Sequence, residues 1–152
     1  MNSDKKTTRI LEDVKINVKI KLSLLWVALV FFYLYNDVIS FFRRDTIEMV
    51  LSGEVPGGIQ INQTFLFAMA ILMAIPVFMT YLSLALPAKV NRWVNIILGI
   101  FHAVVLVSFF VAVPGETWSY YALYMIFEAV FIVLIVWHAW KWPKQEIKPK
   151  SG

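Results

Sequence analysis

Three ionisable side chains interrupt segments of this chain that are otherwise apolar. Asp37 lies in YLYNDVISFF at residues 33–42, His102 lies in GIFHAVV, and Glu128 lies in MIFEAVF. A carboxyl group near an imidazole can hold and pass a proton, which is what a proton relay requires. Ionisable groups within apolar segments are costly and are typical of sites that bind or conduct a solute. The question is therefore whether these three side chains share one site.

The composition indicates which solvent surrounds these segments. Hydrophobic residues make up 60% of the 152 residues and charged residues 16%, whereas a soluble domain is about half apolar and a quarter charged. The length fits one domain, and the apolar excess fits lipid. The absence of cysteine excludes disulfides, thiolate catalysis and cysteine-ligated metals. The net charge of +4 comes largely from lysines that flank the apolar runs, which indicates membrane orientation rather than nucleic-acid binding.

Four apolar segments are long enough to cross a bilayer, because a hydrocarbon core about 30 Å thick needs roughly twenty helical residues. Their continuous apolar character favours helices over a barrel. We therefore expect an all-α, four-helix transmembrane bundle over residues 22–140, between a cytoplasmic tail with an interfacial lead-in at 1–21 and a basic tail at 141–152. The spans are expected at about 22–42, 65–86, 93–113 and 120–140.

The first outer loop predicts a short surface helix. In DTIEMVLSG, Asp45 and Glu48 have the spacing of a capping box, and Gly53 can end a helix. PGG at 56–58 breaks the rest of this loop, and PG at 114–115 predicts a tight turn between the third and fourth spans. The first dozen residues and the last eight are polar, which predicts disorder.

The positive charges predict the orientation. Twelve of the fourteen lysines and arginines lie on one side of the predicted bundle, and only Arg43 and Arg44 lie on the other. The positive-inside rule then predicts that both termini lie in the cytoplasm. The twelve residues are Lys5, Lys6, Arg9, Lys15, Lys19, Lys21, Lys89, Arg92, Lys141, Lys144, Lys148 and Lys150.

Helical periodicity places each ionisable group on the more polar or aromatic stripe of its span. At ~1.5 Å per residue, Asp37, His102 and Glu128 lie roughly 22, 13 and 18 Å from the inner ends of their spans. A compact bundle could therefore bring them together, and we predict a ligand or proton pocket built from these three side chains. Further lining is expected from Tyr33, Asn36, Asn95 and Tyr124.

Each of the three groups also has a structural explanation. Asp37 could form an ion pair at the helix end with Arg44, which lies seven residues further on the same face. His102 could be a hydrogen-bonded packing residue. Glu128 could form an interhelical hydrogen bond worth about 1 kcal/mol. We therefore keep two hypotheses. In the first, the protein binds or passes a small solute, proton or lipid-like ligand. In the alternative, it is a non-catalytic membrane accessory or assembly protein whose polar residues join its helices.

Several chemistries lack their residue patterns. His102 and His138 lie at different depths, which disfavours a bis-histidine haem, and Phe131 stands where a Glu-x-x-His motif would need histidine after Glu128. No motif assigns a catalytic residue, a metal site or a cofactor. A membrane redox component stays a second alternative.

The expected partners are the lipid bilayer and a further copy of the chain in a homo-oligomer. Nucleic acid is excluded, and the sequence identifies no protein partner.

Three stretches carry a resemblance: LSLLWVALVFFYLYNDVIS, AILMAIPVFMTYLSLALPAKVNRWVNIILGI and VWHAWKWP. From about Lys19 to Pro143 the chain resembles a family of small bacterial four-span integral membrane proteins of unassigned function. Members of that family often carry an acid directly before the Ile-Pro of the second span, where this chain has Ala74. In layout alone the chain is similar to DoxX-like membrane proteins. The resemblance implies the fold and a bacterial inner membrane, and it implies no function.

Overall fold

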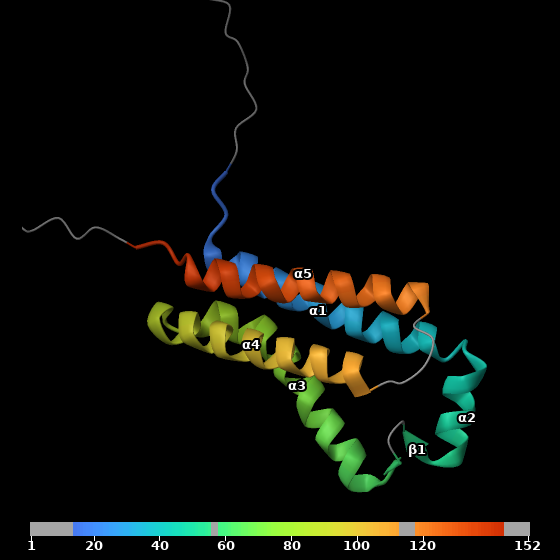
Figure 1. Cartoon of the computed structure of the whole chain (residues 1–152). Helices are drawn as coiled ribbons and strands as arrows, with labels where there is room; N and C mark the ends of the chain where they lie inside the picture. The colour runs from blue at the N-terminus through green and yellow to red at the C-terminus, as the bar shows by residue number, and fades with distance from the viewer. Residues whose placement is uncertain (1–13, 56–57, 113–117, 145–152) are drawn as a thin grey trace, which may run out of the picture.

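The computed structural model describes residues 14–55, 58–112 and 118–144. Four of its helices are long and apolar enough to cross a membrane, so the predicted bundle of four spans with a short extra helix is confirmed (Figure 1). The turn expected at 114–115, most of PGG and the two polar tails lie outside the described residues. The elements are α1 (Val18–Ser40), α2 (Arg44–Ser52), β1 (Glu54–Val55), β2 (Ile59–Gln60), α3 (Gln63–Ala85), α4 (Ala88–Ala112) and α5 (Ser119–Trp140).

Helix α1 is central to the bundle. It packs against both α3 and α5, and α5 also packs against α4. The first turn of α1 and the last turn of α5 lie at the same end of the molecule, which we call the terminal end (Figure 1). The opposite end, which carries α2 and the two short strands, is called the loop end.

Two of the long helices begin earlier than their apolar runs. Helix α1 begins at Val18, and the Asn17 side chain caps it by accepting a hydrogen bond of 2.9 Å from the Lys19 amide. Helix α4 begins at Ala88, directly after Pro87, rather than at Trp93. Hydropathy marks only the apolar part of a helix, whereas the cap and the proline mark where the backbone begins to turn.

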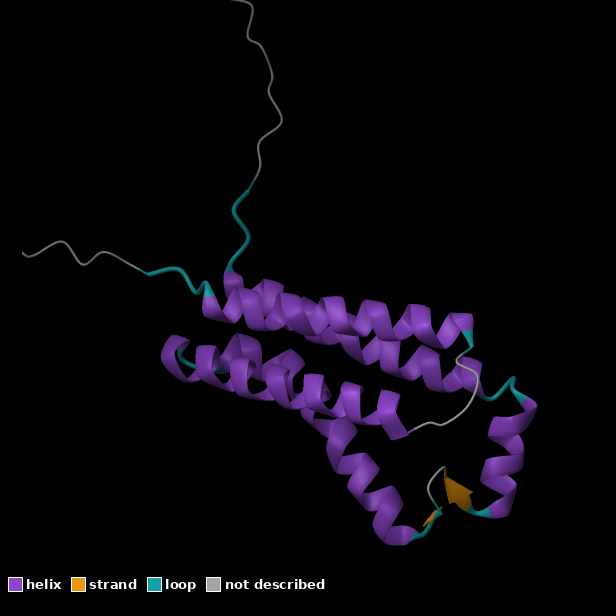
Figure 2. Cartoon of the chain, viewed as in Figure 1, coloured by secondary structure: helices purple, strands orange, loops and turns teal. Residues whose placement is uncertain are grey.

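The loop end contains α2 and a small hairpin (Figure 2). Gly53 ends α2 in the left-handed conformation with φ of 73°, which confirms it as the stop signal. The predicted capping box is wrong, because the N-cap is Arg43 and it makes no side-chain cap. Asp45 lies in the first turn instead, where its carboxylate accepts hydrogen bonds from Arg43. The antiparallel pairing of β1 with β2 was not predicted; it involves two residues on each strand.

Helix α3 holds to the bundle by its second half. Pro76 lies inside this helix and is buried, whereas much of the segment before it is exposed. Proline removes one helical hydrogen bond and is a common cause of bends. The first half of α3 leads away from the other long helices (Figure 1). At the terminal end, the Lys19 ammonium donates to the Leu84 and Leu86 carbonyls at 3.1 and 2.6 Å, which ties α1 to the end of α3.

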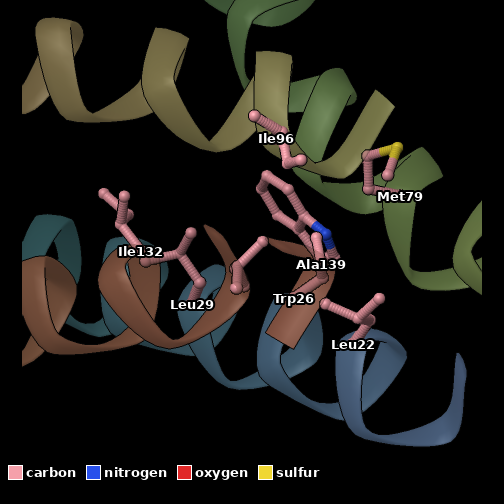
Figure 3. Packing of buried hydrophobic residues seen from close by; sticks show 8 residues of the cluster. Leu22, Trp26, Leu29, Met79, Ile96, Ile132 and Ala139 are labelled. Atoms are coloured by element: carbon pink, nitrogen blue, oxygen red, sulfur yellow. The ribbon is translucent and has the colours of Figure 1, made fainter. Parts of the chain in front are cut away.

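The buried apolar core gathers residues from all four long helices. The Trp26 indole extends from α1 toward Ile96 of α4 and Met79 of α3 (Figure 3). Most of the core residues of α1 and α3 lie in the halves of these helices that are nearer the terminal end, where the four helices are closest. The complete cluster is Leu22, Trp26, Leu29, Met79, Ile96, Ile132, Ile135 and Ala139.

Candidate functional site

Helix α1 presents polar side chains to every other long helix. Their spacing along α1 keeps them on neighbouring faces of one helix. Toward the terminal end, the Ser23 hydroxyl donates to the Thr80 carbonyl of α3 at 2.6 Å. Toward the loop end, the Ser40 hydroxyl lies 2.9 Å from the Tyr120 hydroxyl of α5. Between them, further side chains of α1 contact the two predicted ionisable residues of α4 and α5.

His102 is buried against α1, with 1% of its surface exposed. Its Nδ1 lies 3.3 Å from the Tyr33 hydroxyl, and the two rings stack with centroids 5.9 Å apart. The Trp26 ring meets the imidazole at an angle of 73°. The imidazole Nε2 is buried and has no hydrogen-bond partner among the described residues. One side of the ring is therefore fixed by Tyr33, and the other retains a free polar atom.

Glu128 is buried on α5, with 3% of its surface exposed. The Asn36 amide of α1 donates to its Oε1 at 3.4 Å, which is a long hydrogen bond. No lysine, arginine or histidine forms an ion pair with this carboxyl group among the described residues. The Oδ1 atom of Asn36 is also buried, and it has no hydrogen-bond partner among the described residues. A buried carboxylate with one long hydrogen bond to a neutral amide is poorly stabilised.

Asp37 belongs to neither pair. Its side chain is exposed, although its spacing of four residues from Tyr33 and eleven from Trp26 puts the three on one face of a regular helix. The first half of α3 diverges from the bundle, so the loop end of α1 is less covered than its terminal end (Figure 1). The ion pair with Arg44 is not formed either, because Arg44 binds Glu48 at 2.7 Å. Within the described ranges, no group of three acidic or histidine residues could hold a metal ion.

Asn95 contributes to a separate polar cluster nearer the terminal end. Its Oδ1 accepts from the Trp26 indole at 2.7 Å and from the Ser83 hydroxyl at 3.3 Å. Its amide donates to the Asn91 side chain at 2.6 Å, and the Asn91 amide donates to the Ser83 carbonyl at 2.6 Å. All four side chains are buried. This cluster joins α1, α3 and α4, and the Asn91–Asn95 spacing of four was the signal in the sequence.

We expect Asn95→Ala to lower the free energy of unfolding by about 1–3 kcal/mol, because the Trp26 N–H loses its acceptor in a buried site. The measurement is unfolding by sodium dodecyl sulfate in mixed micelles. Trp26→Phe removes the same hydrogen bond from the other side, so the double variant should be less destabilised than the two single effects combined. Ser108→Ala is the control, because Ser108 is exposed and its hydroxyl binds, within the described ranges, only the Val104 carbonyl of its own helix. Strictly additive single effects would contradict the expectation.

Tyr124 lies outside both polar pairs. It is half-buried on α5, and its ring meets Phe32 of α1 edge-on with centroids 5.6 Å apart. Phe32 also packs against Phe127 and Phe131. The described contacts of Tyr124 are therefore aromatic packing between α1 and α5.

The loop end carries its own charge pairing outside the spans. The Arg43 guanidinium hydrogen-bonds Asp45 and lies 4.8 Å from the centre of the Trp118 ring. Its hydrogen bond holds the pKa of the Asp45 carboxyl below its usual range. Because Trp118 directly precedes α5, Arg43 connects the start of α2 to the start of α5.

Comparisons with known proteins assign the chain to a family, and they assign it no activity. No curated protein and no solved structure matches it. A family model described as a family of unknown function, DUF6326, matches residues 9–149 and so covers all four long helices. The chain is therefore a multi-pass membrane protein with four candidate spans, and it belongs to the DUF6326 family of unknown function.

Proposed function

We propose that this protein binds or passes a proton, or a small polar solute that exchanges one, at a site between α1, α4 and α5. Glu128 is the proton-exchanging group, and Asn36, Tyr33 and His102 complete the polar lining. Asp37 provides an exposed acid on the loop-end side. The proposal is carried by one observation: among the residues that the structure describes, a buried carboxyl group in a candidate span has one hydrogen-bond partner, a neutral amide at 3.4 Å.

The position of Glu128 supports this assignment. It is twelve residues from Trp140 and nine from Ser119, which corresponds to about 18 and about 13 Å along the helix. A carboxylate at such a depth is expensive unless it is paired, hydrated or protonated. The unpartnered Asn36 Oδ1 and His102 Nε2 offer buried hydrogen-bonding atoms to a polar guest.

The orientation belongs to the same proposal. Both the start of α1 and the end of α5 lie at the terminal end (Figure 1). Arg43 and Arg44 lie at the loop end beside acidic partners. The other described lysines and arginines lie toward the terminal end. This distribution supports an orientation with the terminal end in the cytoplasm. The bacterial inner membrane is part of the proposal because the chain resembles small bacterial membrane proteins. The similarity in layout to DoxX-like proteins contributes no residue to the site.

Infrared difference spectroscopy of the protein in lipid tests the proton-exchanging role. We expect the carboxylic-acid carbonyl band of the wild type to change with pH, and the part of the band that belongs to Glu128 to be missing in Glu128→Gln, since an amide has no carboxylic-acid carbonyl. Glu48→Gln should retain the band, because Glu48 is exposed and lies outside the spans. Proton uptake by vesicles containing Glu128→Gln should fall to the level of protein-free vesicles.

A structural role is the second candidate, and the direct pairing of polar side chains across helices favours it. Trp26 binds Asn95, Tyr33 contacts His102, and Asn36 binds Glu128. Such pairs stabilise helix association by about 1 kcal/mol each. If the carbonyl band never changes with pH while Glu128→Gln lowers the unfolding midpoint, Glu128 is a structural residue of an accessory protein and the proton-exchanging role is wrong.

A further inference from the structure

An apolar groove runs between α4 and α5 on the outside of the bundle. Its volume is about 570 Å³, and it extends from Ile100 to Ser108 on α4 and from Ile132 to Trp140 on α5. Eight residues of helix correspond to about 12 Å, compared with about 15 Å for the hydrocarbon of one leaflet. The Ser108 hydroxyl is already bound to the Val104 carbonyl of its own helix, so the groove presents little polarity to a guest. It therefore fits an acyl chain.

A second hollow of about 220 Å³ lies at the terminal end, where the segment leading into α1 meets the end of α5. Three lysines line it, Lys15, Lys21 and Lys141. His138 also lines it, with its Nδ1 2.8 Å from the Leu134 carbonyl oxygen of its own helix. No acidic residue lines it within the described part of the chain. The hollow is therefore complementary to an anion.

Trp137 lines both hollows. The Lys141 ammonium lies 5.0 Å from the centre of its ring, which holds one positive charge at the boundary between the two. Beside the groove, the Arg92 guanidinium lies 5.7 Å from the centre of the Trp140 ring. The apolar groove therefore leads to the basic hollow, and the tryptophans beside both indicate the depth of the membrane interface.

The lysines at this end differ in their engagement. The Lys19 ammonium donates hydrogen bonds to carbonyl groups at the end of α3, so it is already engaged within the protein. Lys15, Lys21 and Lys141 are exposed, and their ammonium groups have no hydrogen-bond partner among the described residues. These three charges are available to a ligand.

We propose that an anionic phospholipid binds at the terminal end, with its phosphate between Lys15, Lys21 and Lys141 and an acyl chain in the α4/α5 groove. Any lipid can fill an apolar groove, but the three lysines select a negatively charged headgroup. Each lysine near a membrane surface strengthens the attraction of an anionic lipid about fivefold. This site is separate from Glu128, so it stands whether or not the proton-exchanging role is correct.

Native mass spectrometry of the full chain tests the proposal. The purified protein is mixed with equal amounts of phosphatidylglycerol and phosphatidylcholine that carry the same acyl chains. We expect retained phosphatidylglycerol to exceed phosphatidylcholine, and Lys21→Gln to weaken its binding about fivefold. The variant with Lys15, Lys21 and Lys141 all replaced by glutamine should show no preference. Val104→Trp, which fills the groove from an exposed position, should reduce the binding of both lipids.

Lys89→Gln is the matched control. Lys89 is exposed in the first turn of α4 at the same end of the bundle, and it does not line the basic hollow. Equal retention of the two lipids would overturn the proposal. So would a loss in Lys89→Gln as large as that in Lys21→Gln, because the effect would then be general surface charge. Displacement of the lipid by inorganic phosphate as effectively as by added phosphatidylglycerol would also overturn it, by showing a site for a free anion.

Discussion

Replacing Trp26 with alanine should cause the largest loss of stability in this protein, roughly 3–5 kcal/mol in the free energy of unfolding. The indole is fully buried where α1, α3 and α4 meet (Figure 3). Lipid is as apolar as the core, so the loss comes from packing contacts and the cavity rather than from transfer out of water. Asn95 also loses the donor that lies 2.7 Å from its Oδ1.

Unfolding in mixed micelles, followed by circular dichroism, measures this loss without relying on tryptophan fluorescence. Trp26→Phe should fall between wild type and Trp26→Ala, because it keeps much of the side-chain volume while it loses the N–H donor. Trp93→Ala is the matched control, since that indole is 49% exposed. If Trp93→Ala destabilises the protein as much as Trp26→Ala does, the indole at 26 is not the centre of the core.

The existence of the four long helices could be predicted because each depends only on local composition. Their ends were less predictable. Val18 to Lys21 and Ala88 to Arg92 are helical although they include charged residues, and the hydropathy that a membrane imposes ends where the headgroups begin. The N-terminus of α2 was also misread: Asp45 and Glu48 have the spacing of a capping box, but Arg43 engages the Asp45 carboxylate, and the N-cap position is Arg43, two residues earlier in the chain.

The candidate site was predictable in its residue types and less so in its pairing. Periodicity put Asp37 with Tyr33, whereas the structure puts the neighbouring Asn36 against Glu128 and leaves Asp37 exposed. Which face of α1 is covered depends on where α3 leaves the bundle, and a helix pattern contains no information about its neighbours. Asn95 was assigned to the same pocket, but its hydrogen bonds hold it in the cluster with Asn91 and Ser83.

The contact between α4 and α5 gives the second large expected effect. Gly99 is buried, and a Cβ atom placed on it would lie 2.7 Å from Val136 Cγ2 and 3.6 Å from Ile135 Cγ2. The absence of a side chain at 99 therefore allows the two helices to approach closely, as small residues do between membrane helices. We expect Gly99→Leu to lower the free energy of unfolding by about 1–3 kcal/mol, because the added side chain must force α5 away from α4.

Gly99→Ala separates crowding from helix propensity. Alanine is favoured over glycine in a helix by about 1 kcal/mol, while its Cβ meets Val136, whose branched side chain adjusts poorly. Val136→Ala removes the obstructing methyl group, so the double variant Gly99→Ala/Val136→Ala should be more stable than the two single effects combined predict. Unfolding midpoints of the four proteins in mixed micelles measure this coupling. Additive effects, or a Gly99→Leu variant as stable as the wild type, would show that α4 and α5 are held apart by other contacts and that Gly99 does not set their distance.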